Sequence, residues 1–177
     1  GKCIQCEAGT YSEGETSSIC SSCSDGYYSL KGASQCEICQ EGCQGYCTKS
    51  TGKCIGCKAG YGFTSSKDCE KCTVGNYGEG GTYSCSRCEI DTHTSKEGQS
   101  SCDECSSTCR DYSETESMCE FETGNCIQCE KGYINVGLTC QVCGIGTYTN
   151  SYTATKCTNC VDLTYQDEEG QSQCKTC

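Results

Sequence analysis

Residues 23–39, which read CSDGYYSLKGASQCEIC, contain the pattern that decides the fold. A cysteine is followed by a glycine and an aromatic residue, then by a polar stretch, and then by a Cys-x-x-Cys pair. Glycine permits a turn with positive φ and the tyrosine ring can cover a neighbouring disulfide, so each such stretch predicts one short two-stranded loop. The same order recurs at Gly9-Thr10-Tyr11, Gly60-Tyr61, Gly75-Asn76-Tyr77, Gly132-Tyr133 and Gly146-Thr147-Tyr148.

Cysteine spacing also organises the chain into longer repeats. Of the 26 cysteines, 22 form eleven Cys-x-x-Cys pairs. The four cysteines outside these pairs are Cys43, Cys47, Cys109 and Cys119. A shift of about 66 residues, which becomes about 72 after a short insertion in the second repeat, superimposes the cysteine pattern on itself. The recurrence predicts a first cysteine-rich repeat at residues 1–67, a second at 68–138 and a partial third at 139–177.

The composition requires covalent cross-links. Only 17 of the 177 residues are Ile, Leu, Val or Phe, Trp is absent, and the formal net charge is −11. Such a chain cannot bury enough apolar surface to offset its conformational entropy, so disulfides must supply the order. Disulfides persist in oxidising compartments, and we therefore expect an extracellular or cell-surface protein of the secretory pathway.

The expected fold is small and disulfide-rich. It is an extended tandem array of short two-stranded β-loop modules with almost no helix, because no helical apolar periodicity survives the closely spaced cysteine pairs. Acidic composition argues against nucleic acid as a partner and offers no basic patch for anionic lipid. No apolar run reaches transmembrane length, so membrane attachment would need a segment not present in these 177 residues.

Sequence does not prove disulfide connectivity, but spacing narrows it. The two cysteines of one Cys-x-x-Cys pair are expected to end one loop and to begin the next, and the four extra cysteines create two crossed segments. The predicted single-loop bridges are Cys6–Cys20, Cys23–Cys36, Cys57–Cys69, Cys72–Cys85, Cys88–Cys102, Cys129–Cys140, Cys143–Cys157 and Cys160–Cys174. The predicted crossed bridges are Cys39–Cys47 with Cys43–Cys54, and Cys105–Cys119 with Cys109–Cys126.

Two cysteines remain outside this scheme. Cys3 matches the position of Cys69, which closes a loop opened upstream, and Cys177 matches Cys105, which opens a segment running downstream. We therefore expect both to pair with residues outside this segment, as parts of a longer array.

The motif Cys-x-x-Gly-Thr-Tyr, followed by a polar stretch and Cys-x-x-Cys, resembles the growth-factor-receptor cysteine-rich superfamily over the entire chain. It is similar to the single-disulfide loops of tumour-necrosis-factor receptors and to ephrin-receptor-like repeats. Residues 39–54, Cys-x3-Cys-x3-Cys-x6-Cys, resemble the furin-like module, whose cysteines pair first to third and second to fourth. The dense array also resembles protist surface proteins: variant surface proteins of Giardia, the intermediate lectin subunit of Entamoeba, and ciliate surface antigens.

The Cys-x-x-Cys pairs and His93 could in principle carry chemistry, but each also has a structural explanation. Paired Cys-x-x-Cys motifs can bind zinc, but eleven pairs is an odd number and disulfides suit the compartment better. A thioredoxin-like redox role would need a helix and aliphatic strands that the sequence lacks. His93, the single histidine, lies five residues after Cys88, the spacing at which other modules carry tyrosine, so packing is favoured over catalysis.

The acidic residues and the tyrosines could each serve either ligand binding or structure. The acidic groups, Asp103-Glu104, Glu114 with Glu116, and Asp167-Glu168-Glu169, could bind calcium, but their spacing matches no calcium loop and favours a solvated face. The tyrosines could form a ligand-binding stripe, yet their fixed position beside glycine and cysteine favours packing on disulfides.

The sequence indicates no enzyme active site and no cofactor. The first functional hypothesis is an extracellular structural or display protein of the cell surface, as a stalk, coat or fibre, whose partners are neighbouring modules of the same chain or other copies of itself. The alternative is an adhesin or lectin-type binding module that recognises a surface protein or a glycan. The insertion that differs between repeats, with Arg110, Asp111 and Tyr112, is the candidate binding loop.

Overall fold

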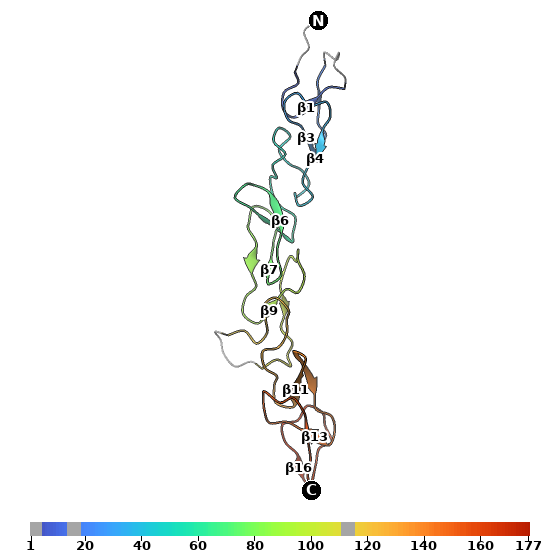
Figure 1. The fold of residues 1–177 in the computed structure, drawn as a ribbon, viewed down its shortest axis with the longest axis vertical. Helices are drawn as coiled ribbons and strands as arrows, with labels where there is room; N and C mark the ends of the chain where they lie inside the picture. Colours follow the sequence, from blue (N-terminus) through green and yellow to red (C-terminus); the bar gives the residue numbers. More distant parts are fainter. Residues whose placement is uncertain (1–4, 14–18, 111–115) are drawn as a thin grey trace. The chain divides into compact units, whose positions relative to one another are not determined.

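The computed structural model describes residues 5–13, 19–110 and 116–177. Within these ranges the chain forms eight separate two-stranded antiparallel sheets and no helix, as the sequence predicts (Figure 1). Each sheet joins the segment after one cysteine pair to the segment inside the next pair. The sheets are β1 (Thr10–Tyr11) with β2 (Ser21–Ser22), β3 (Tyr27–Tyr28) with β4 (Glu37–Ile38), β5 (Tyr61–Phe63) with β6 (Cys69–Lys71), β7 (Asn76–Tyr77) with β8 (Ser86–Arg87), β9 (Thr92–His93) with β10 (Asp103–Glu104), β11 (Tyr133–Val136) with β12 (Thr139–Val142), β13 (Thr147–Tyr148) with β14 (Thr158–Asn159), and β15 (Thr164–Tyr165) with β16 (Lys175–Thr176).

The chain divides into two compact units. The first comprises Gly1–Arg87 with Lys96–Ser101, and the second comprises Cys88–Ser95 with Cys102–Cys177. These units describe packing, whereas the three predicted repeats describe a recurrence of cysteines, so the repeat boundaries stay a prediction.

Twelve disulfides replace a conventional hydrophobic core. The structure joins the cysteines in the pairs that the spacing predicts, including the two crossed segments, Cys39–Cys47 with Cys43–Cys54 and Cys105–Cys119 with Cys109–Cys126. The largest buried cluster consists of six half-cystines of the first unit, against which Tyr28, Tyr61 and Phe63 pack. Covalent cross-links of this kind stabilise the fold mainly by restricting the unfolded chain.

A backbone relay connects successive modules within each unit. At Ser29, Gly78 and Thr149, the residue after the aromatic accepts a hydrogen bond from the preceding module and donates one to the following module. In the first unit, the Gly9 N–H donates to the Ser29 carbonyl (2.9 Å) and the Ser29 N–H donates to the Lys49 carbonyl (3.0 Å). In the second unit, Gly132 donates to Thr149 in the same way (2.9 Å). Ser29 and Thr149 are buried, and so are the corresponding residues Thr94 and Gln166.

Two modules keep the positive φ of the motif without its glycine. Gly26 has φ 85°, and the corresponding residues Asp91 and Leu163 both have φ 64°. The Asp91 carboxylate accepts a hydrogen bond from the Met118 N–H (2.8 Å). The side chain at this left-handed position therefore makes a contact that glycine could not make. Leu163 is 79% exposed, and its side chain therefore gains little from packing. The turn requires a left-handed residue at this position whether or not glycine supplies it.

The aromatic position packs on the following module. A Cβ on Gly52 would lie 2.8 Å from the ring of Tyr28, and a Cβ on Gly124 would contact the ring of His93. Since the two pairs correspond between repeats, His93 occupies the aromatic packing position that the sequence predicts for it. Tyr165 is more exposed than the other aromatics at this position, at 45%.

Candidate functional site

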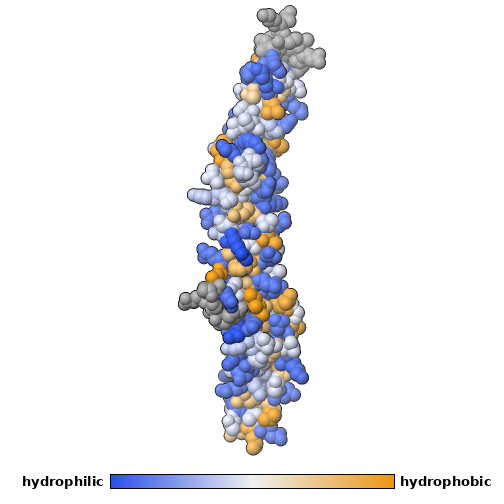
Figure 2. Space-filling model, turned by 60° about the vertical axis from the view of Figure 1, so that its left-hand side comes forward, coloured by the Kyte–Doolittle hydropathy of each residue, from blue (hydrophilic) through white to orange (hydrophobic). Residues whose placement is uncertain are grey.

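The described residues show three features that could carry function: a cluster of disulfides, a cation stacked beside the insertion, and open pockets on the first unit. Figure 2 shows hydrophobic residues in small separate groups among hydrophilic ones on the visible face. No helix among the described residues is long and apolar enough to cross a membrane.

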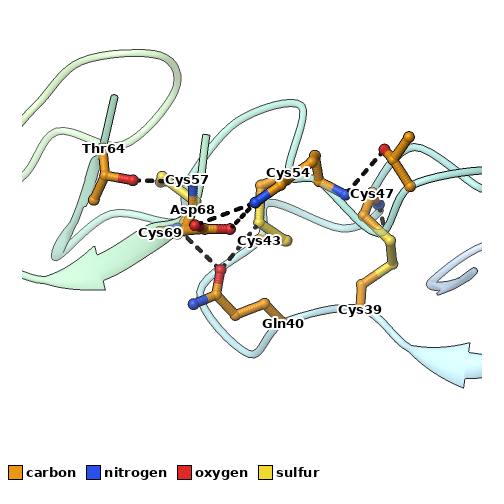
Figure 3. The surroundings of a disulfide bond; sticks show 11 residues. Cys39, Gln40, Cys43, Cys47, Cys54, Cys57, Thr64, Asp68 and Cys69 are labelled. Carbon is orange, nitrogen blue, oxygen red and sulfur yellow. Dashed lines mark hydrogen bonds and ion pairs between the residues drawn. A yellow bond between two sulfur atoms is a disulfide. The ribbon is translucent and has the colours of Figure 1, made fainter. Parts of the chain in front are cut away.

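The disulfide cluster lies where the crossed segment meets the next module (Figure 3). The sulfur atoms of Cys43, Cys54 and Cys69 lie within 4.8 Å of one another and are buried. All three belong to disulfides and have no thiolate to offer a metal. Gln40 fastens this cluster, because its side-chain oxygen accepts the Cys69 N–H at 3.0 Å. The geometry fits a structural cross-link rather than a zinc site.

A polar turn stands beside the cluster, at residues 64–68 (Figure 3). The Thr64 N–H donates to the Asp68 carbonyl (2.9 Å), the Lys67 N–H donates to the Thr64 carbonyl (3.0 Å), and the Thr64 hydroxyl accepts the Asp68 N–H (3.1 Å). The Asp68 carboxylate accepts hydrogen bonds from the Ser66 hydroxyl (2.6 Å) and from Lys53 (3.0 and 3.3 Å). These two donors, Ser66 first, lower the pKa of Asp68 below its usual value.

Of the three residues predicted to bind a ligand, the structure describes Arg110. Asp111 and Tyr112 lie outside the described residues. Arg110 donates a hydrogen bond to the Gln128 side-chain oxygen (2.7 Å), and its guanidinium carbon lies 3.8 Å from the centre of the Tyr152 ring. Lys131 approaches the same ring at 5.3 Å. Arg110 therefore makes cation–π and hydrogen-bond contacts that connect modules of the second unit, and its role in ligand binding stays a prediction.

Two of the three acidic residues at 167–169, Asp167 and Glu168, form ion pairs. The Lys175 ammonium lies 2.6 Å from Asp167 and 3.6 Å from Glu168, and its hydrogen bond lowers the pKa of Asp167. Both carboxylates and the lysine are exposed, so these pairs contribute little to stability. The arrangement fits the solvated face that the spacing favours over calcium binding.

Two of the open pockets on the described part of the first unit had no signal in the sequence. One, of about 420 Å³, lies over β3 and β4, where Tyr27 (42% exposed) and Ile38 (73% exposed) stand beside Glu41 and Lys58. The other has a volume of about 500 Å³ and lies against the disulfide cluster. Its lining includes Thr48, Thr51, Lys53, Ile55, Phe63, Lys67 and Thr82. The residues that line each pocket come from separate segments, which the disulfides bring together. No local sequence motif therefore predicts these pockets.

Comparison with known proteins gives a partial match. A 51-residue stretch, 29% of this chain, is 41% identical to ephrin type-A receptor 7 of Gallus gallus, and it covers 5% of that receptor. No known family profile matches the chain. The disulfide-linked hairpin modules and this match fit a cysteine-rich, receptor-like repeat, of the kind found in extracellular proteins. Because the match is to a vertebrate receptor, it gives no support to the particular protist families that the sequence resembles.

Proposed function

We propose that this chain is a structural, display segment of an extracellular surface protein. The observation that carries the proposal is the relay through Ser29 and its counterparts Gly78 and Thr149, in which one module satisfies backbone groups of the next. Such modules depend on their neighbours for stability, as in other repeat proteins. A segment of this kind can present other domains at a surface without any chemistry of its own.

The disulfide framework has a direct test. Titration of the denatured, unreduced protein with a thiol reagent should find at most two reactive thiols, those of Cys3 and Cys177. Reduction of the disulfides should unfold the chain even under mild conditions, because the described residues form no large aliphatic core. Many free thiols, or unchanged stability after complete reduction, would exclude this function.

Surface display has a second test. A tagged parent protein, expressed in its own host or in a eukaryotic secretory system, should be labelled on intact cells by a membrane-impermeant biotin reagent or recovered from the medium. Retention of the folded protein in the cytosol would contradict the proposal. The proposal also holds that the chain is not an enzyme. Of the described cysteines, Cys177 alone is outside a disulfide, and His93 packs on a neighbouring module.

An adhesive or lectin-type role is the second candidate, and the open pockets favour it. The first unit exposes Tyr27 and Ile38 beside one pocket and gathers two lysines and three threonines in the other. Saturable binding on a glycan array, or capture of a defined surface protein, would support adhesion. If the protein neither binds a glycan nor captures a surface protein, the structural function is favoured over the adhesive one.

A further inference from the structure

We propose that the pocket lined by Lys53, Lys67 and Phe63 binds an anionic saccharide, one that carries a carboxylate or a sulfate. This proposal names a ligand class for the adhesive function and rests on that function. The structural function does not depend on it. The pocket lies wholly within the first unit and contains residues from three separate turns. Its volume, about 500 Å³, falls within the range of small-molecule sites.

Charge is the first argument. The chain carries 13 lysines and arginines against 24 acidic residues, yet two lysines and no acidic residue line this pocket. Lys53 is held by Asp68, which leaves its other ammonium hydrogens able to donate. Lys67 is exposed and has no ion pair among the described residues. One lysine therefore provides an uncompensated charge, and the other provides an oriented donor.

Rigidity is the second argument. Five hydrogen bonds within residues 64–68 fix the turn that carries Lys67, and that residue adopts the left-handed conformation with φ 62°. A pair of backbone hydrogen bonds between Cys57 and Gly81 (2.7 and 2.8 Å) holds the segment of Thr82. A site built on such turns loses little conformational entropy when a ligand binds.

Composition of the wall is the third argument. Phe63 packs against the disulfide cluster and also lines the pocket, beside the exposed side chain of Ile55. Thr48, Thr51 and Thr82 surround these apolar groups with hydroxyls, which can donate and accept. A sugar ring presents an apolar C–H face together with hydroxyls on its edge, and an acidic sugar adds the anion that Lys67 requires. A bare inorganic anion would leave the apolar wall without a partner.

The second repeat provides an internal comparison. Its corresponding hairpin, β11 with β12, has Asn135 in place of Phe63 and Leu138 in place of Lys67. Leu138 shares the left-handed conformation, with φ 74°, although the turn is shorter: Gly137 and Leu138 alone join β11 to β12, whereas residues 64–68 join β5 to β6. An antiparallel hairpin thus forms here without the cation and the aromatic. The hairpin fold therefore does not require these two residues, which is expected if they serve a ligand.

The test uses the whole 177-residue protein and three matched probes: 3′-sialyllactose, lactose 3-sulfate and lactose. Binding is measured by ligand-observed NMR and calorimetry in low salt, and amide shifts locate the site. We expect saturable binding of one or both charged saccharides, with shifts at residues of this pocket, and no saturable binding of lactose. The two charged probes show whether carboxylate or sulfate is preferred.

Substitutions at one position provide the controls. Lys67→Asn tolerates the left-handed conformation and should weaken binding about threefold to fivefold, the range expected for one exposed ion pair. Lys67→Arg should retain binding. Lys58→Ala, in the neighbouring pocket, should leave it unchanged. Equal binding of lactose, equal binding of sulfate ion alone, no saturable binding, or full affinity in Lys67→Asn would each overturn the site. Saccharide binding that keeps its full affinity in Lys67→Asn would preserve the adhesive role while removing this pocket from it.

Discussion

The ring of His93 packs against the backbone of Gly124, so that a Cβ at Gly124 would overlap the imidazole. Gly124 also has φ 74°, a conformation that costs a non-glycine residue about 1–2 kcal/mol. The two effects act together, and we expect Gly124→Ala to destabilise the second unit by about 2 kcal/mol or more. Hydrogen exchange at the Thr94 N–H, which donates to the Phe121 carbonyl (3.0 Å), would report the loss locally.

Gly144 is the matched control for this substitution. A Cβ there would meet no heavy atom within 4 Å, and Gly144 is not among the positive-φ glycines. Gly144→Ala should therefore leave the thermal midpoint and the exchange of Thr94 unchanged. Similar effects of Gly124→Ala and Gly144→Ala would refute the packing argument.

Ser29 should be the most sensitive small residue of the relay in the first unit. Its side chain is 1% exposed, and its hydroxyl donates to the Thr10 carbonyl at 2.9 Å. Ser29→Ala leaves that carbonyl without its donor and should lower the free energy of unfolding by about 1 kcal/mol. Denaturant unfolding with the disulfides intact, followed by tyrosine near-ultraviolet circular dichroism, measures the change. Ser24→Ala, at an exposed serine of the same module, should have no comparable effect.

The fold was largely predictable because cysteine spacing is a discrete signal. A bridge needs its two Cα atoms within about 7 Å, so closely spaced pairs allow few closures, and the twelve closures in the structure are those predicted. The position of His93 followed from the same arithmetic. The buried residue after several of the aromatics was missed, since the hydroxyls of Ser29 and Thr94 and the amide of Gln166 form no single sequence motif. What these residues share is a backbone role, which composition does not reveal.

The candidate site was not predictable for a different reason. The insertion that begins at Arg110 stood out because it breaks the repeat, yet Arg110 makes structural contacts with Gln128 and Tyr152. The pocket at Phe63 and Lys67 breaks no cysteine spacing. Only the disulfide-closed turns bring Thr48 and Thr82 to it.

Leu163 offers a stabilising substitution. It holds φ 64° where the motif elsewhere has glycine, and its side chain is exposed. Leu163→Gly removes steric strain of about 1–2 kcal/mol and adds an entropic cost of about 0.5–1 kcal/mol in the unfolded chain. The net expectation is a gain of up to about 1.5 kcal/mol, which thermal unfolding with intact disulfides would show as a raised midpoint. Leu163→Val, which keeps the strain and adds a β-branch, should lower the midpoint instead, and a lower midpoint for the glycine variant would be inconsistent with strain at this turn.

The carboxylate of Asp68 should make the first unit sensitive to acid. Hydrogen bonds from Ser66 and then Lys53 hold its pKa below the usual aspartate value in the folded protein. Since the folded pKa is the lower one, the ionised group stabilises the fold above the unfolded pKa, and this contribution is lost as the pH falls through the folded pKa. A titration of the aspartate side-chain carbon shifts should show a depressed midpoint for Asp68. Ser66→Ala should raise that midpoint toward the usual value, because it removes the larger cause. Asp167, whose pKa is lowered by Lys175 in the other unit, should titrate unchanged in the same variant. A midpoint for Asp68 that does not move in Ser66→Ala would show that the serine hydroxyl does not hold the carboxylate in solution.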